Sequence, residues 1–210
     1  SADTADRLGP RRITQAGLAA PRTVRNAAFG VLGVAALAGV YLVAVGGWPS
    51  ALVGTLSLLA ALAYTAGPWP LAYHGLGDVF VFTCFGPIAV SGTVLLQTGG
   101  IDRVTVLASI PVACLVTAIL VVNNLRDIAT DARAGKRTLA VRLGARASRI
   151  EYAALVALAV LMLPVLGVAA GAGVFLALGA LPLAAHEVRA LTRRSGSALN
   201  ASLAGTARLH

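Results

Sequence analysis

Long apolar stretches separated by short polar segments make up most of this 210-residue chain. Each stretch is close to the ~20 residues that a helix needs to cross the hydrocarbon core of a bilayer, and flanking Gly and Trp residues extend the shorter ones. The pattern therefore predicts an all-α integral membrane helical bundle, organised as a single domain over residues 1–210. The six expected transmembrane helices cover residues 27–45, 51–66, 79–96, 104–122, 152–166 and 174–185. The last two lie in one apolar run, which we expect to fold back near residues 167–173.

The composition agrees with a membrane protein, since 58% of the residues are hydrophobic against roughly 45–50% in soluble domains. The net charge of +9 would suit a nucleic-acid partner, but its distribution argues against one. Counting alternate loops as one side of the membrane puts 16 of the 17 Lys and Arg residues together and leaves only Arg103 on the other side. Positive charge collects on the cytoplasmic side of bacterial membranes. We therefore expect a multi-pass protein of the bacterial inner membrane, with both termini and the 123–150 loop in the cytoplasm, the lipid bilayer as a partner and no nucleic acid.

The most informative polar segment follows the fourth apolar stretch and reads NNLRDIATDARAGKRTLAVRLG over residues 123–144. Asn123, Asp127 and Asp131 recur every four residues, so on a helix they form one polar stripe with side chains about 5–6 Å apart. Two carboxylates at that spacing repel each other unless a cation lies between them. Mg²⁺ suits that position, because it typically binds one or two carboxylates together with substrate phosphate oxygens. Basic side chains nearby can neutralise the remaining phosphate charge; they are Arg126, Arg133, Lys136 and Arg137.

A simpler interpretation of this segment is a solvated helix face, because two Asp residues among basic neighbours usually form weak surface ion pairs. That interpretation does not account for the Asn pair at the membrane boundary or for the Gly-Lys-Arg-Thr turn at 135–138. We therefore favour a metal–diphosphate site at the mouth of a membrane protein. No charged residue lies deep within a predicted transmembrane helix, which argues against an ion-coupled transporter.

The same segment resembles a known family. The pattern N-N-x-R-D-x-x-x-D-x-x-x-G-K-R-T-L-A-V-R-x-G, met at every specified position, is similar to the second aspartate-rich motif of the UbiA superfamily of intramembrane prenyltransferases. The resemblance is closest to the 1,4-dihydroxy-2-naphthoate polyprenyltransferases, and DRLGPRRITQAGL (6–18) and GPWPLAYHGLGDVFVFTCFGPIAVSGT (67–93) extend it. It implies Mg²⁺-dependent transfer of a polyprenyl group from polyprenyl diphosphate to 1,4-dihydroxy-2-naphthoate, giving demethylmenaquinone in menaquinone biosynthesis.

The resemblance also implies roles for individual residues. The expected metal ligands are Asp127 and Asp131, with Asn123 as a neutral member. The expected catalytic residues are Asp127, Asp131, Lys136 and Arg137, and the expected diphosphate-binding residues are Arg126, Lys136 and Arg137.

The loop before the third predicted helix contributes further candidates, because the resemblance places it over the active-site cavity. Tyr73, His74 and Asp78 are candidates for binding the acceptor or for closing the loop. An acid at position 78 would equally serve the positive end of a helix. Trp69 is more simply explained as an anchor at the membrane interface.

Several alternatives stay open at this level. The family's first aspartate motif, N-D-x-x-D, is absent, and six helices match the third to eighth of the nine in the family fold. We therefore expect a fragment, incomplete at both ends and inactive alone. Within the superfamily, 4-hydroxybenzoate or homogentisate are alternative acceptors. A membrane transporter or structural subunit is the alternative from another class. A CDP-alcohol phosphotransferase would require an Asp-Gly pair, which the chain lacks.

Overall fold

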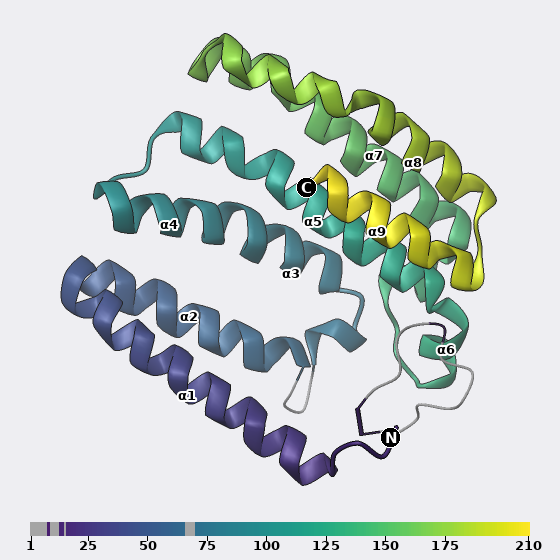
Figure 1. Ribbon diagram of the computed structural model, residues 1–210, viewed down its shortest axis with the longest axis horizontal. Coiled ribbons are helices and arrows are strands. Elements are labelled where there is room, and N and C mark those ends of the chain that lie inside the picture. Colours follow the sequence, from purple (N-terminus) through teal and green to yellow (C-terminus); the bar gives the residue numbers. More distant parts are fainter. Residues whose placement is uncertain (1–7, 9–12, 15, 66–69) are drawn as a thin grey trace.

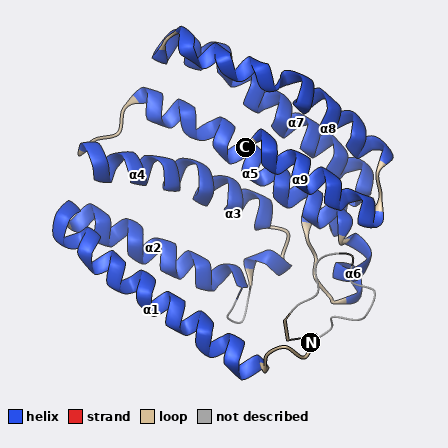
Figure 2. Cartoon of the chain, in the orientation of Figure 1, coloured by secondary structure: helices blue, strands red, loops and turns tan. Residues whose placement is uncertain are grey.

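The computed structural model describes residues 8, 13–14, 16–65 and 70–210, and every regular element in these ranges is helical (Figures 1 and 2). The first half contains α1 (Pro21–Gly46), α2 (Trp48–Thr65), the 3₁₀ turn η1 (Leu71–Tyr73), α3 (Gly77–Thr83), the π-helical turn η2 (Cys84–Ile88) and α4 (Ala89–Thr98). The second half contains α5 (Arg103–Arg126), α6 (Ile128–Arg133), α7 (Leu139–Ala170), η3 (Ala172–Ala180), α8 (Leu181–Arg193), η4 (Gly196–Ala198) and α9 (Leu199–Leu209).

Most of these helices are long and apolar enough to cross a bilayer. Five helical stretches meet that criterion: Pro21–Gly46, Gly77–Thr98, Arg103–Arg126, Leu139–Ala170 and Ala172–Arg193. The second predicted span corresponds to a shorter apolar helix, Trp48–Tyr64, so the expected count of six is not established. The all-α membrane fold itself is confirmed, and the chain is a multi-pass membrane protein.

Helix α5 occupies the centre of the bundle. It packs against α3, η2 and α4 on one side and against α7 and α9 on the other. Small buried side chains, including Ala113, Cys114 and Ala118, let the neighbouring helices approach closely. By contrast, α1 packs on α2 and has no buried residue of its own. Its exposed apolar side chains fit contact with lipid.

The third span contains the clearest local irregularity. Pro87 has no N–H to continue the α-helical hydrogen bonding, and the chain forms a π-helical turn around it. In the same turn, a Cβ added at Gly86 would overlap the Cβ of Ala113 and lie 2.9 Å from the carbonyl oxygen of Ser109. A glycine at this position therefore allows η2 to cross close to α5.

Helix α7 is much longer than the 152–166 span expected from the sequence. It begins after Thr138, whose hydroxyl oxygen accepts a hydrogen bond from the Val141 N–H at 3.3 Å. It is interrupted at Gly144, which adopts φ 82°. Because the added turns carry Arg142, Arg146 and other polar residues, an apolar-run criterion could not detect them.

The connections between helices gather at two opposite ends of the bundle (Figure 1). The α1–α2, α4–α5 and α7–η3 turns lie at the left of this view, whereas η1, α6 and the α8–α9 connection lie at the right. The α7–η3 turn falls at Gly171, with φ 104°, inside the segment where the fold-back was expected. The end of the bundle that carries α6 therefore contains the polar segment singled out in the sequence.

Candidate functional site

The stripe of Asn123, Asp127 and Asp131 lies where α5 gives way to α6. The sequence predicted one continuous helix through these residues, but α5 ends at Arg126 and Asp127 forms the junction, with φ −96° and ψ 8°. Hydrogen bonds still link residues four apart: the Asp127 N–H donates to the Asn123 carbonyl at 3.1 Å, and the Asp131 N–H to the Asp127 carbonyl at 2.8 Å. The helix axis is interrupted while the four-residue spacing is kept.

All three side chains line one cavity of about 280 Å³. The cavity lies between the α5–α6 junction, the start of α7, and the segment from the end of α2 to the start of α3. The remaining lining residues are Tyr64, Ala72, Tyr73, Gly77, Asp78, Leu120, Asn124, Lys136, Thr138 and Leu139. Acids, an amine, amides and apolar side chains thus face the same space.

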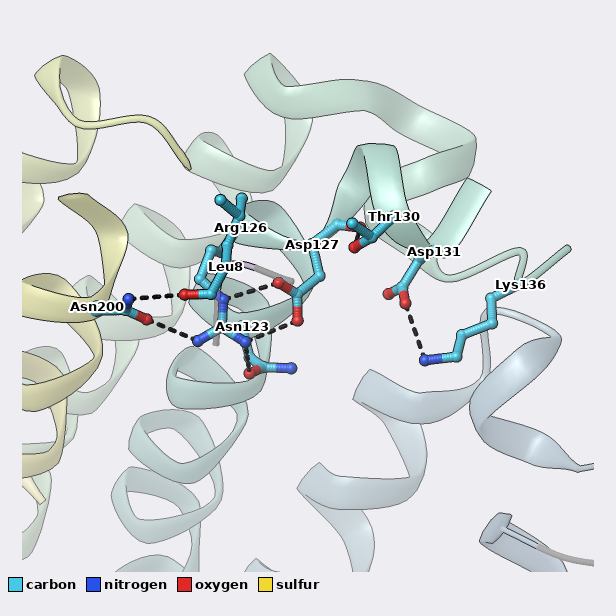
Figure 3. A network of polar contacts seen from close by, with 8 residues as sticks. All are labelled: Leu8, Asn123, Arg126, Asp127, Thr130, Asp131, Lys136 and Asn200. Atoms are coloured by element: carbon cyan, nitrogen blue, oxygen red, sulfur yellow. Dashed lines mark hydrogen bonds and ion pairs between the residues drawn. The ribbon is translucent and has the colours of Figure 1, made fainter. Parts of the chain in front are cut away.

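Arg126 fixes the side chain of Asp127 through hydrogen bonds (Figure 3). Its guanidinium donates to both carboxylate oxygens of Asp127, from Nε at 2.8 Å and from Nη2 at 2.7 Å. It also donates to the side-chain oxygens of Asn123 and Asn200, each at 2.8 Å. The arginine side chain is only 5% exposed, and Arg126 does not line the cavity. Its four hydrogen bonds fix the orientation of Asp127.

Lys136 forms the second ion pair, with Asp131 (Figure 3). Its Nζ lies 2.8 Å from Oδ1 of Asp131 and 5.4 Å from the centre of the Tyr73 ring. The backbone strengthens this corner, because the Lys136 N–H donates to the Asp131 carbonyl and the Arg137 N–H to the Tyr73 carbonyl, both at 2.9 Å. The second of these bonds attaches the α6–α7 connection to η1.

The two carboxylates therefore each have a side-chain cation of their own, which relieves the repulsion that the sequence argument assigned to a metal. Their chemistry still fits Mg²⁺: Asp127, Asp131 and the amide of Asn123 offer hard oxygen donors around one cavity. Within the described ranges, no group of three His, Cys, Asp or Glu side chains could hold a metal ion. A metal here would take the rest of its shell from water and phosphate oxygens, as Mg²⁺ commonly does.

The other sequence candidates divide into two groups. Tyr73 and Asp78 line the cavity, whereas Arg137 and His74 do not. The Arg137 side chain is exposed, and the imidazole Nδ1 of His74 lies 2.9 Å from the Pro70 carbonyl oxygen. Trp69 lies outside the described residues. The catalytic and binding roles assigned to these residues stay predictions.

Tyr64, at the entry of the 67–78 loop, was a further sequence candidate for orienting the acceptor or closing the loop, and it lines the cavity. Sequence reasoning missed two other contributors. Leu120 lies inside α5, so it resembles an ordinary membrane-facing residue. Asn200 lies 74 residues from Arg126 in the sequence, and no local pattern links the two. Asn200 also donates to the Leu8 carbonyl at 3.0 Å, which connects α9 and the N-terminal segment to the site.

Comparison with known proteins shows that the chain is similar to one protein family and to several curated bacterial proteins. Residues 4–205 match the UbiA prenyltransferase family. The chain is 44% identical over 154 residues to "1,4-dihydroxy-2-naphthoate octaprenyltransferase" of Mycobacterium tuberculosis, covering 73% of the chain and 53% of that protein. It is 39% identical over 165 residues to the protein of the same name from Haemophilus influenzae, covering 76% of the chain and 54% of that protein. The chain thus spans about half the length of these curated relatives.

Proposed function

The chain belongs to the UbiA prenyltransferase family, and on that premise we propose that its gene product transfers a polyprenyl group from polyprenyl diphosphate to 1,4-dihydroxy-2-naphthoate. The observation that carries the proposal is the shared cavity, into which oxygen donors for a metal and a lysine for a phosphate both project. The names of the relatives support the naphthoate acceptor. The product would then be demethylmenaquinol, the reduced form of a demethylmenaquinone, within menaquinone biosynthesis.

Asp127, Asp131 and Asn123 would hold Mg²⁺ in this reaction. A metal held by these residues would supply positive charge that neutralises the leaving diphosphate. Arg126 takes a different role from the direct diphosphate contact expected from the sequence. Because its guanidinium is buried and already makes four hydrogen bonds, it positions the Asp127 carboxylate.

Lys136 is the cation that can serve the diphosphate directly. It is more exposed than Arg126, with 27% of its side chain accessible, and it lines the cavity. When the diphosphate binds, Lys136 would exchange part of its contact with Asp131 for a phosphate oxygen. Arg137, exposed and next in the sequence, would supply a second cation. Both would stabilise charge that grows on the leaving diphosphate as the bond breaks.

The chemistry then proceeds at the apolar side of the cavity. The allylic C–O bond breaks, its electron pair leaves with the diphosphate, and the electron-rich ring attacks the allylic carbocation. The ring would then regain its aromaticity by releasing its carboxylate as CO₂. Leu120, Leu139 and the tyrosine rings that line the cavity would keep water away from that cation. The tail of the prenyl donor, being apolar, would extend into the bilayer.

The distribution of charge supports an orientation for the reaction. Seven Lys and Arg residues lie between Arg126 and Arg149, and α6, within that segment, lies at one end of the bundle (Figure 1). We propose that this end faces the cytoplasm of a bacterial cell and that the protein resides in the inner membrane. The diphosphate would thus bind from the cytoplasmic side.

The test is a mass-resolved prenylation assay of the full-length gene product in lipid nanodiscs. Polyprenyl diphosphate is offered with 1,4-dihydroxy-2-naphthoate, 4-hydroxybenzoate and homogentisate together, with Mg²⁺ or with EDTA. We expect the mass of the prenylated and decarboxylated naphthoate, and we expect this product to be absent with EDTA. If only 4-hydroxybenzoate or only homogentisate is prenylated, that compound is the acceptor, and the protein is still a prenyltransferase of this family. No product from any acceptor would refute the proposed function.

A further inference from the structure

Asp78 is the one acid of the cavity whose environment the scheme above leaves unexplained. It is the second residue of α3 and is only 5% exposed. Its Oδ1 is buried and has no hydrogen-bond partner in the described part of the chain, and the residue lines the same cavity as Asp127 and Asp131. A buried carboxylate oxygen without a partner is costly, which points to a ligand that completes it.

Two ordinary explanations leave part of this carboxylate unexplained. As an acid in the first turn of α3, Asp78 lies at the positive end of that helix, but this leaves its Oδ1 without a partner among the described residues. Metal binding is the second. Asp78 does not join Asp127 and Asp131 in a three-ligand cluster, since the described residues contain none. The carboxylate therefore belongs to another part of the cavity.

The surroundings of Asp78 suit a flat ring. Tyr64 stacks on Phe80, with ring centres 5.1 Å apart and an interplanar angle of 27°, so its position is fixed by packing. Tyr64 and Leu120 both lie next to Gly77, because a Cβ on this glycine would be in van der Waals contact with Oη of Tyr64 at 3.5 Å and with Cδ2 of Leu120 at 3.7 Å. An aromatic ring, a leucine and a lone carboxylate acceptor thus frame this part of the cavity. The ligand that completes it must donate a hydrogen bond and carry no negative charge at that point.

We propose that the Asp78 carboxylate accepts a hydrogen bond from a ring hydroxyl of the aromatic acceptor, an inference that rests on the proposed function. The diphosphate is repelled from this carboxylate and binds at the Lys136 end, so the two ends of the cavity sort the two substrates. The hydrogen bond fixes the rotation of the ring in its plane. It also draws the hydroxyl proton away from its oxygen, which makes the ring carbons more electron-rich towards the allylic cation. No bond to hydrogen is broken in this step.

The test compares two ligands that differ only in hydroxyl groups, 1,4-dihydroxy-2-naphthoate and 2-naphthoate. Equilibrium binding of each is measured by fluorescence to full-length protein in nanodiscs, without diphosphate, for wild type, Asp78→Asn and Asp102→Asn. Asp102 is the matched control, because it is an exposed acid at the opposite end of the bundle and Asn also caps helices well. Wild type and control should prefer the dihydroxy ligand by roughly 10- to 100-fold, as for a hydrogen bond to a charged group. Asp78→Asn should lose most of this preference and bind 2-naphthoate as wild type does.

Steady-state kinetics provide the second readout. Asp78→Asn should raise KM for the dihydroxynaphthoate about tenfold or more and leave KM for polyprenyl diphosphate within twofold. The inference is overturned if Asp78→Asn keeps the wild-type preference for the dihydroxy ligand. It is also overturned if the substitution changes only the KM for the diphosphate or the Mg²⁺ requirement, or if Asp78→Asn unfolds. Wild-type protein that shows no preference for the hydroxyl groups would overturn it as well. If wild type forms the prenylated product of 1,4-dihydroxy-2-naphthoate in any of these cases, the proposed function stands without the role of Asp78. If it forms no product, the proposed function fails on its own.

Discussion

We expect Arg126 to contribute more to the free energy of unfolding than any exposed arginine at the same end of the bundle. Replacing it with Leu removes four hydrogen bonds and leaves the Asp127 carboxylate, 19% exposed, without its cation. Removing one partner of a buried ion pair typically costs about 3–5 kcal/mol. Because Asp127 keeps some contact with solvent, we expect Arg126→Leu to lower the free energy of unfolding by about 3 kcal/mol.

A substitution of Asn200 separates the free energy of the Arg126–Asn200 hydrogen bond from the other contributions of Arg126. Asn200→Ala removes the 2.8 Å contact with the guanidinium and the 3.0 Å contact with the Leu8 carbonyl, and should cost about 1.5–3 kcal/mol. In a double-mutant cycle with Arg126→Leu, the shared hydrogen bond should appear as a coupling energy of about 1 kcal/mol or more. Arg146→Leu, a change of an exposed arginine in α7, is the control and should stay within about 0.5 kcal/mol of wild type.

Reversible unfolding in mixed micelles with increasing SDS, followed by circular dichroism, supplies these free energies. If Arg126→Leu matches Arg146→Leu, or if the cycle gives a coupling below about 0.3 kcal/mol, Arg126 does not clamp Asp127 as described. The functional consequence is measured on the same proteins. With its carboxylate released, Arg126→Leu should need a higher Mg²⁺ concentration for half-maximal activity, whereas the control should not.

Three further outcomes follow from other parts of the structure. Gly86→Ala should lower the free energy of unfolding by about 1–3 kcal/mol through overpacking against α5, while Gly54→Ala, which has open space around it, should change it little; equal effects in SDS unfolding would contradict the close crossing. In a background without Cys, an impermeant thiol reagent applied to intact cells should label a cysteine at exposed Gln97 and not one at exposed Ala132, and the reverse pattern would invert the proposed orientation. Lys136→Gln should reduce kcat by about 10²-fold or more, as for loss of one charge-stabilising donor, with KM for the acceptor unchanged; a selective rise in the acceptor KM would contradict a role at the diphosphate.

The helices that lie in lipid could be found from the sequence because their signal is local. Runs of apolar residues at 27–45 and 104–122 correspond to α1 and α5, and each observed helix extends only a few residues beyond its run. The start of α7 could not be found in this way. Its first turns carry arginines and a glycine that breaks the helix at position 144, so they resemble a loop.

The site shows the same division between local and distant information. The four-residue spacing of Asn123, Asp127 and Asp131 is a local property, and it predicted that they would face one space. The break at Asp127 left no mark in the spacing, because hydrogen bonds between residues four apart continue through it. The clamp of Arg126 by Asn200 and the unpartnered oxygen of Asp78 depend on packing between distant segments. Neither could be read from the residues around it.

The central claim is that Asp127 and Asp131 bind a metal–diphosphate complex, and equilibrium binding of a non-cleavable polyprenyl thiolodiphosphate tests it most directly. Binding to full-length protein in nanodiscs is measured by calorimetry with Mg²⁺ and with EDTA, for wild type, Asp127→Asn, Asp131→Asn and the control Asp102→Asn. We expect Mg²⁺ to tighten binding at least tenfold in wild type and control, and each of the two substitutions to remove most of this gain. Binding that does not depend on Mg²⁺, or a full Mg²⁺ effect in both Asp127→Asn and Asp131→Asn, would contradict it.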